Sequence, residues 1–154
     1  MPVLSFEAGH RIVPWESMRI LAFDLGKKRI GLAMTDPMRI TAQGMDTFER
    51  TNIREDIARL SQLMQENNVS LMLFGNPLHM SGDESRQTEF VRTFADRLSL
   101  ATGVPYDMWD ERLTSVEAER MLRESGLKER RDRKGMVDKL SAMILLNSYL
   151  AAIG

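Results

Sequence analysis

Three acidic residues stand where their side chains could take part in chemistry. Asp24 follows the short apolar run 20–23, Glu111 stands at the end of an expected strand at 104–109, and Asp138 lies one turn into the expected last helix. Strand ends of an α/β sheet converge on one edge, where ligands commonly bind. If the last helix crosses that edge, the three carboxylates meet there.

Clustered carboxylates favour the binding of a hard cation. Three of them repel one another and would have raised pKa values unless divalent cations neutralise them. Because the chain has no cysteine, an all-oxygen site would select Mg²⁺ or Mn²⁺. Two such ions can activate water and stabilise the leaving oxygen of a phosphodiester. Two ions could be held here, but spacing alone favours the alternative of three ordinary surface acids.

The turn that follows Asp24 is basic. Gly26 is followed by Lys27, Lys28 and Arg29, and cations beside a carboxylate suit phosphate and metal chemistry. We expect the turn to contact phosphate. The alternative is a solvated hairpin turn that the aspartate merely starts.

A second basic stretch, residues 126–135, reads GLKERRDRKG. We expect it to be a mobile, solvated loop that contacts a nucleic-acid backbone without reading its sequence. Plain solubility is the alternative. The candidate contacts are Arg130, Arg131, Arg133 and Lys134.

Two further residues could be read as functional. His79 lies in the turn-rich loop 76–82, and we expect a surface position rather than a general base. Trp109 precedes the acids at the end of its strand, and we expect it in the core rather than stacked on a base.

The expected elements position the acids on one sheet. The first strand is apolar on both faces, which predicts a central strand covered on both sides. Asn52 with Glu55, and Thr114 with Glu117, are capping-box patterns that begin helices. The element order β-β-β-α-β-α-β-α-α predicts an α/β fold, a mixed five-stranded sheet with helices on both faces. Strands are expected at 20–24, 30–34, 38–48, 70–74 and 104–109, and helices at 52–67, from Ser81 or Asp83 to Gly103, at 114–124 and at 136–153.

Length and composition set the remaining expectations. At 154 residues one domain is the default, which we place at 18–154 behind an N-terminal extension, 1–17, of unknown role. The net charge of −1 requires any nucleic-acid surface to be a local patch. No apolar run approaches the roughly 18 residues of a membrane span, and no secretory signal is evident. We expect a cytoplasmic protein, with a monomer favoured over a dimer.

Four segments of the chain resemble the YqgF family. The combination of D-x-G-x-K-R-I-G, D-E-R-L-T-[ST]-x-E-A and a late V-D is specific, whereas any one of these motifs alone would be weak. The segments are RILAFDLGKKRIGLAMTDP at 19–37, GNPLHMSG at 75–82, WDERLTSVEAERML at 109–122 and KGMVDKLSAMILLNSYL at 134–150.

The resemblance implies an RNase H-like fold and a nuclease. Members are described as Holliday junction resolvases and as nucleases that mature pre-16S rRNA. By motif position, Asp24, Glu111 and Asp138 are implied to be the metal-binding catalytic carboxylates. Lys27, Arg29 and Arg112 are implied to be candidates for holding the scissile phosphate.

The expected function is therefore a metal-dependent endonuclease acting on structured nucleic acid, with 5′-end processing of pre-16S rRNA as the first choice. The alternatives are a Holliday junction resolvase, which would need two active sites and hence a dimer, and a non-catalytic module that binds nucleic acid during ribosome assembly. Asn76 departs from the expected pattern, because an apolar residue is typical between the Gly and Pro of the second segment.

Overall fold

The structure is a computed structural model of the chain. It describes residues 4–5, 13–14, 18–112, 114–125 and 130–153, without the side chains of 4–5, 13–14, 115, 119, 122, 125 and 130–135. In the expected N-terminal extension, β1 (Leu4–Ser5) pairs antiparallel with β2 (Val13–Pro14). The other strands form a separate sheet.

The main sheet is mixed and is built around its first strand. β3 (Arg19–Leu25) pairs antiparallel with β4 (Arg29–Thr35) and parallel with β7 (Val69–Asn76), and β8 (Tyr106–Asp110) runs parallel to β7. The spatial order is β5-β4-β3-β7-β8. The carboxyl ends of β3, β7 and β8 therefore meet at one edge of the sheet, as the strand order predicted.

The edge of the sheet beside β4 differs from the prediction, which was a single third strand at 38–48. Two short strands, β5 (Ala42–Gly44) and β6 (Phe48–Glu49), pair with β4 instead. Before them, the carboxylate of Asp36 accepts hydrogen bonds from the backbone N–H groups of Ile40 and Thr41, at 2.8 and 2.7 Å. These local bonds turn the chain where a continuous strand was expected.

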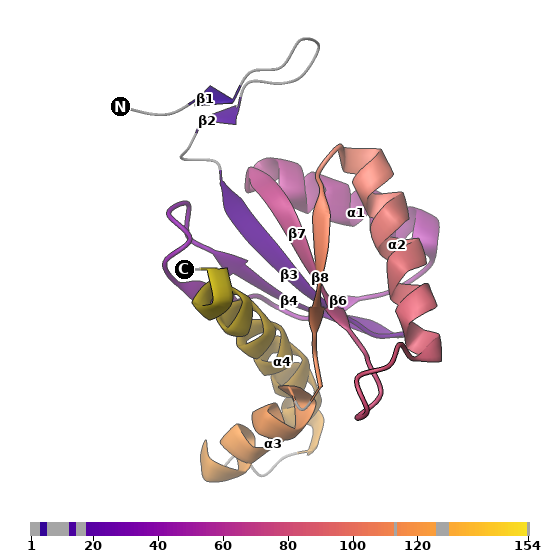
Figure 1. Ribbon diagram of the computed structural model, residues 1–154, viewed down its shortest axis with the longest axis vertical. Coiled ribbons are helices and arrows are strands. Elements are labelled where there is room, and N and C mark those ends of the chain that lie inside the picture. Colours follow the sequence, from indigo (N-terminus) through magenta and orange to yellow (C-terminus); the bar gives the residue numbers. More distant parts are fainter. Residues whose placement is uncertain (1–3, 6–12, 15–17, 113, 126–129, 154) are drawn as a thin grey trace.

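Two helices cover one face of the sheet. They are α1 (Ile53–Glu66) and α2 (Arg86–Thr102), seen together on one side in Figure 1. Asn52 caps α1 as predicted, since its side chain accepts from the Glu55 N–H at 3.0 Å. The prediction for α2 was wrong at its start: the N-cap residue is Ser85, whose backbone N–H donates to the Thr88 hydroxyl at 3.2 Å, whereas Ser81 and Asp83 are hydrogen-bonded to each other in the preceding loop.

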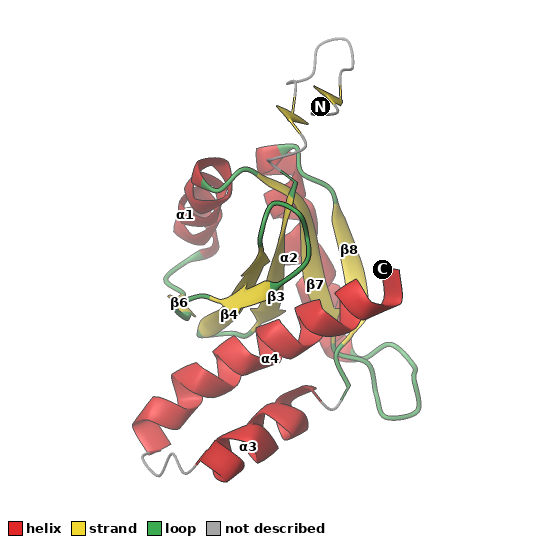
Figure 2. Ribbon diagram, turned by 90° about the vertical axis from the view of Figure 1, so that its left-hand side faces the viewer, coloured by secondary structure: helices red, strands yellow, loops and turns green. Residues whose placement is uncertain are grey.

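The opposite face carries α4 (Arg130–Ile153), which runs across the sheet with α3 (Thr114–Ser125) alongside it (Figure 2). The helix begins at Arg130 rather than at 136, so the predicted loop 126–135 is wrong from residue 130 onward, and residues 126–129 lie outside the described part. Arginine and lysine are good helix formers, so the charged run extends the helix. Asp138 consequently lies more than two turns into it.

Each face of β3 packs into its own core, as the two-sided apolar strand predicted. Leu21 and Phe23 pack with α1 and α2, and Phe23 stacks on Phe74 with ring centroids 4.4 Å apart. Ile20 and Ala22 point to the other face and pack with α4. This double burial makes β3 a rigid support for the residues at its carboxyl end.

Helix α4 has one property that the sequence analysis did not anticipate. Its segment Met136–Ile153 is, within the described residues, long and apolar enough by length and composition to cross a membrane. In the fold, Ala142, Leu145 and Leu146 on this segment are buried against the sheet. Such packing is typical of a core helix.

Candidate active site

Asp24 is the next-to-last residue of β3 and lies opposite Gly31 of β4. Its side chain is partly buried. Burial is the largest influence, and together with the negative charge of Asp138 it raises the pKa of Asp24 to about 6. A hydrogen bond with Glu111 lowers the pKa of Asp24 and so offsets part of this rise. The rigid strand thus holds a largely buried carboxyl group whose negative charge is poorly compensated.

Glu111 directly follows β8. Its N–H donates to the carbonyl oxygen of Asn76 at 3.2 Å, which extends the alignment of β8 with β7 by one residue. A side chain at Gly75 would overlap the Glu111 carboxyl group, so this glycine makes room for it. Burial, the charge of Asp24 and their mutual hydrogen bond raise the pKa of Glu111 to about 8, with a smaller contribution from Asp110. Asp24 and Glu111 therefore form a pair that shares a proton at neutral pH.

Asp138 reaches the same edge from α4. Its backbone lies against Gly31, where any side chain would overlap the Asp138 carbonyl group, and the adjoining Ser141 and Ala142 are buried. These small residues allow α4 to approach the sheet closely beside Asp138. The Asp138 carboxylate accepts from Arg29 Nε at 2.8 Å, so a cation of the basic turn occupies one side of it.

The three carboxyl groups offer the oxygen donors that Mg²⁺ or Mn²⁺ prefer. The raised pKa values of Asp24 and Glu111 mark negative charge that a cation would compensate. As they stand, however, no three Asp, Glu, His or Cys side chains among the described residues are gathered closely enough to hold an ion. In this arrangement Asp24 is paired with Glu111, and Asp138 is paired with Arg29.

The basic candidates divide into exposed and engaged side chains. Lys27 is exposed on the β3–β4 turn, whereas Arg29 is directed to Asp138. Arg112 is engaged as well: its Nε and Nη2 donate to the Asp110 carboxylate at 2.9 and 2.7 Å, and its Nη1 donates to the carbonyl oxygen of Met80 at 3.1 Å. Arg112 thereby ties the loop after β7 to the end of β8.

The four candidates in the second basic stretch fall within α4. The backbone of Arg130, Arg131, Arg133 and Lys134 is helical. Their side chains lie outside the described part of the chain.

Comparison with known proteins identifies the family. The family model described as "RuvX: Holliday junction resolvase" matches residues 18–152. The chain belongs to this family. It is 46% identical over 136 residues to a protein of Koribacter versatilis, covering 88% of both chains, and 44% identical over 136 residues to one of Syntrophus aciditrophicus, covering 88% of this chain and 90% of the other. Both relatives carry the provisional name of pre-16S rRNA nuclease.

Solved structures place this RuvX-family chain in the predicted RNase H-like class of fold. Thermus thermophilus RuvC, determined with a Holliday junction substrate, superposes with a TM-score of 0.57 at 15% identity, covering 89% of this chain and 96% of that one. A fowlpox virus resolvase, in complex with Holliday junction DNA, gives 0.55 at 10% identity, covering 88% and 99%. The resemblance found in the sequence is confirmed, and the chain is a member of a family of nucleases.

The departure at Asn76 has a structural role in this RuvX-family chain. Asn76 is the last residue of β7, and its Oδ1 accepts from the Thr88 hydroxyl on α2 at 2.9 Å. Its carbonyl oxygen accepts from Leu78 and from Glu111. The polar side chain thus joins the end of β7 to α2, at the point where an apolar residue was expected.

Sequence reasoning did not identify Gly31 and Gly75 as site-forming residues. Both stand in the quoted motifs, at the G of R-I-G and the G of G-N-P, and that placement was the available signal. The expected surface position of His79 is confirmed, whereas Trp109 is only partly buried at the margin of the core. His79 is exposed in its loop, and Trp109 packs against the core edge-on to Tyr149, with ring centroids 5.3 Å apart.

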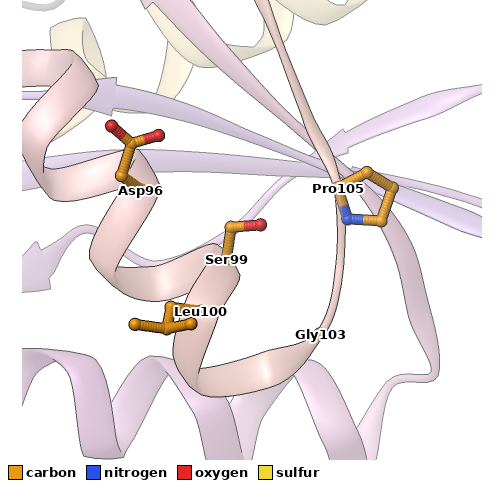
Figure 3. A pocket seen from close by; sticks show the side chains of 5 residues that line it. All are labelled: Asp96, Ser99, Leu100, Gly103 and Pro105. Carbon is orange, nitrogen blue, oxygen red and sulfur yellow. The ribbon is translucent and has the colours of Figure 1, made fainter.

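A shallow hollow elsewhere on the molecule does not belong to this site. Figure 3 shows it between the end of α2 and the start of β8, where Ser99, Leu100 and Pro105 are among its lining residues. Because β8 runs parallel to β3 and β7, the start of β8 lies at the edge of the sheet opposite Asp24 and Glu111.

Proposed function

We propose that the protein is a metal-dependent endonuclease that hydrolyses phosphodiester bonds in structured nucleic acid. The observation that carries this proposal is the arrangement of the carboxyl groups of Asp24, Glu111 and Asp138 at one sheet edge, two of them with raised pKa values. A protein that only bound nucleic acid would gain nothing from negative charge facing phosphates. The basic turn between β3 and β4 adjoins the same edge.

In this proposal Asp24, Glu111 and Asp138 hold Mg²⁺ or Mn²⁺, with two ions in the complete site. The ions would supply an activated water and stabilise the leaving oxygen. For the carboxyl groups to act as ligands, the Asp24–Glu111 pair must lose its shared proton and Arg29 must release Asp138. Arg29 is then free to turn toward the scissile phosphate beside Lys27.

The proposed substrate is the 5′ region of pre-16S rRNA, because the relatives at 44–46% identity carry that name. A Holliday junction is the second candidate, since the family description names it. The catalytic unit is the single domain 18–154, and a cytoplasmic monomer is part of the first proposal. A junction resolvase would require a dimer, because two strands must be cut.

Cleavage of two labelled substrates tests the proposal. A pre-16S rRNA 5′-leader RNA and a synthetic four-way DNA junction are each incubated with Mn²⁺ or with EDTA. Metal-dependent cutting of the RNA alone supports the rRNA nuclease, and paired symmetric nicks in the junction support the resolvase. Binding of either nucleic acid without cutting under any condition contradicts the nuclease proposal.

The matched variants are Asp24→Asn and Asp36→Asn. Asp36 follows β4, which runs antiparallel to β3, and so lies at the opposite edge of the sheet. We expect Asp24→Asn to abolish cleavage with binding retained, and Asp36→Asn to cleave as the wild type does. Equal activity of the two variants would remove Asp24 from the proposed site.

A further inference from the structure

A buried ion pair lies beside the basic turn, outside the carboxylate site. Arg50 follows β6, and its Nε donates to Asp56 Oδ2 at 3.0 Å. The Asp56 side chain is fully buried and that of Arg50 is 11% exposed. The other Asp56 oxygen accepts from the Thr51 N–H at 3.0 Å. Because both oxygens are hydrogen-bonded, the pair fixes the direction of the arginine side chain.

The same arginine binds the β3–β4 turn at two points. The Arg50 Nη1 donates to the carbonyl oxygen of Gly26 at 3.0 Å. The backbone N–H of Arg50 donates to the carbonyl oxygen of Lys28 at 2.9 Å. These two carbonyl groups flank Lys27. The turn itself is closed by the Gly26 N–H, which donates to the carbonyl oxygen of Arg29 at 2.9 Å.

Both helices on this face contribute to the hold on Arg50. Asp56 belongs to α1, and the guanidinium carbon lies 5.1 Å from the ring centroid of Phe94 and 5.8 Å from that of Phe90, both on α2. Within the described residues, Lys27 makes no recorded ion pair or hydrogen bond of its own. Arg50 therefore holds the backbone from which the exposed Lys27 side chain projects.

We propose that Arg50 is a positioning residue for phosphate binding: it holds the β3–β4 turn so that Lys27 faces the nucleic-acid backbone. This inference rests on the proposed function, in which Lys27 contacts phosphate. Arg50 has no recorded contact with Asp24, Glu111 or Asp138, so its substitution acts on binding and leaves the chemical step largely intact.

The test variant is Arg50→Lys, which keeps a positive charge for Asp56 but cannot also donate to the turn through a guanidinium. Binding of a fluorescent pre-rRNA leader RNA is measured in EDTA over a series of salt concentrations. We expect affinity to fall roughly fivefold and the slope of log K against log salt to shrink by about one phosphate contact. KM should rise with kcat changing little.

The matched control is Arg59→Lys. Arg59 also donates through Nη1 to a backbone carbonyl, that of Glu49 at 3.1 Å, and lies over an aromatic ring, that of Phe48 at 4.2 Å. No recorded contact joins it to the turn. We expect the slope of log K against log salt for Arg59→Lys to match that of the wild type. An equal loss in both variants would show a general effect of arginine removal and overturn the inference.

A double-mutant cycle with Lys27→Ala separates the inference from the function on which it rests. If Arg50 acts through the turn, Arg50→Lys adds no further loss in the Lys27→Ala background. Fully additive losses overturn the positioning role and leave the phosphate role of Lys27 intact. Unchanged binding in Lys27→Ala removes the phosphate role, and with it the inference.

Because Asp56 is buried, each variant is checked by thermal unfolding before binding is measured. Should Arg50→Lys not fold, Asp56→Asn loosens the arginine without altering the turn or its cations. In Asp56→Asn we expect the slope of log K against log salt to shrink as in Arg50→Lys, but by a smaller amount. An unchanged slope in a folded Asp56→Asn protein contradicts the proposal.

Discussion

Replacing Glu111 by glutamine should make the metal-free protein more stable at neutral and mildly alkaline pH. In the folded state Glu111 keeps its proton up to about pH 8, whereas the ordinary value is 4.5. Between these values the folded protein binds more protons than the unfolded chain, so its free energy of unfolding falls as pH rises. The contribution is fully present below pH 4.5 and is lost as pH passes through about 8.

The size of the effect follows from the same values. At 1.36 kcal/mol per pKa unit, a rise from 4.5 to about 8 corresponds to about 5 kcal/mol. This is an upper bound, because the Asp24 and Glu111 protons belong to one coupled pair. A glutamine keeps the shape of the protonated acid and can still donate to Asp24, so it retains the favourable hydrogen bond and cannot become charged.

The assay is urea unfolding in EDTA at pH values from 5 to 8. We expect the wild-type free energy of unfolding to decline by several kcal/mol at most over this range, and the decline to be much weaker in Glu111→Gln. Asp36→Asn is the control, because hydrogen bonds lower the pKa of Asp36 and keep it ionised throughout. A wild-type stability that is flat between pH 5 and 8, or a decline of equal size in Glu111→Gln, would refute the reasoning.

The remaining predictions concern how α4 and the basic turn meet the site. Gly31→Ala should lower the free energy of unfolding by about 1–3 kcal/mol, because the new methyl group would overlap the backbone of Asp138. Gly44→Ala, measured alongside by urea unfolding, should cost less, since its methyl group would meet the movable side chains of Lys139 and Met143; an equal cost contradicts the argument. Arg29→Gln should tighten Mn²⁺ binding severalfold in titrations followed by electron paramagnetic resonance, because it removes the guanidinium that competes for the carboxylate; unchanged or weaker binding contradicts it.

Much of the fold was predictable because its signals are local. The apolar run of β3 predicted burial on both faces, and Phe23 and Ala22 lie in separate cores. The capping pattern at Asn52 placed the start of α1 to within a residue. Each of these depends on the chemistry of a few neighbouring side chains, which the sequence displays directly.

The errors arose where distant or alternative contacts decide the outcome. Ser81, Asp83 and Ser85 are all residue types that can cap a helix, and the folded structure places Ser85 at the N-cap, where its N–H donates to Thr88. The hydrophilic composition of the charged stretch before residue 136 predicts a loop. Its helical propensity allows α4 to start at Arg130.

For the candidate site, the sequence predicted that Asp24, Glu111 and Asp138 lie toward one edge of the sheet, but not the partners that their side chains have there. The carboxyl ends of β3 and β8 and the crossing helix α4 share one edge, which follows from element order. There Asp24 pairs with Glu111 and Asp138 pairs with Arg29, and no three acidic side chains among the described residues are gathered closely enough to hold an ion. The engagement of Arg29 by Asp138 and of Arg112 by Asp110 could not be predicted, since each depends on side-chain geometry. A catalytic role for any of these residues stays a prediction.

The β3–β4 turn now has two anchors with different consequences. On one side Arg29 is held by Asp138, which belongs to the proposed metal site, and on the other the carbonyl groups of Gly26 and Lys28 are held by Arg50. Binding of a cation would release only the first anchor, because no recorded contact links Arg50 to the carboxylates. The turn would therefore keep its backbone position while Arg29 changes partner. Metal binding and phosphate binding are thus expected to be coupled through Arg29, with Lys27 contributing affinity whether or not metal is present.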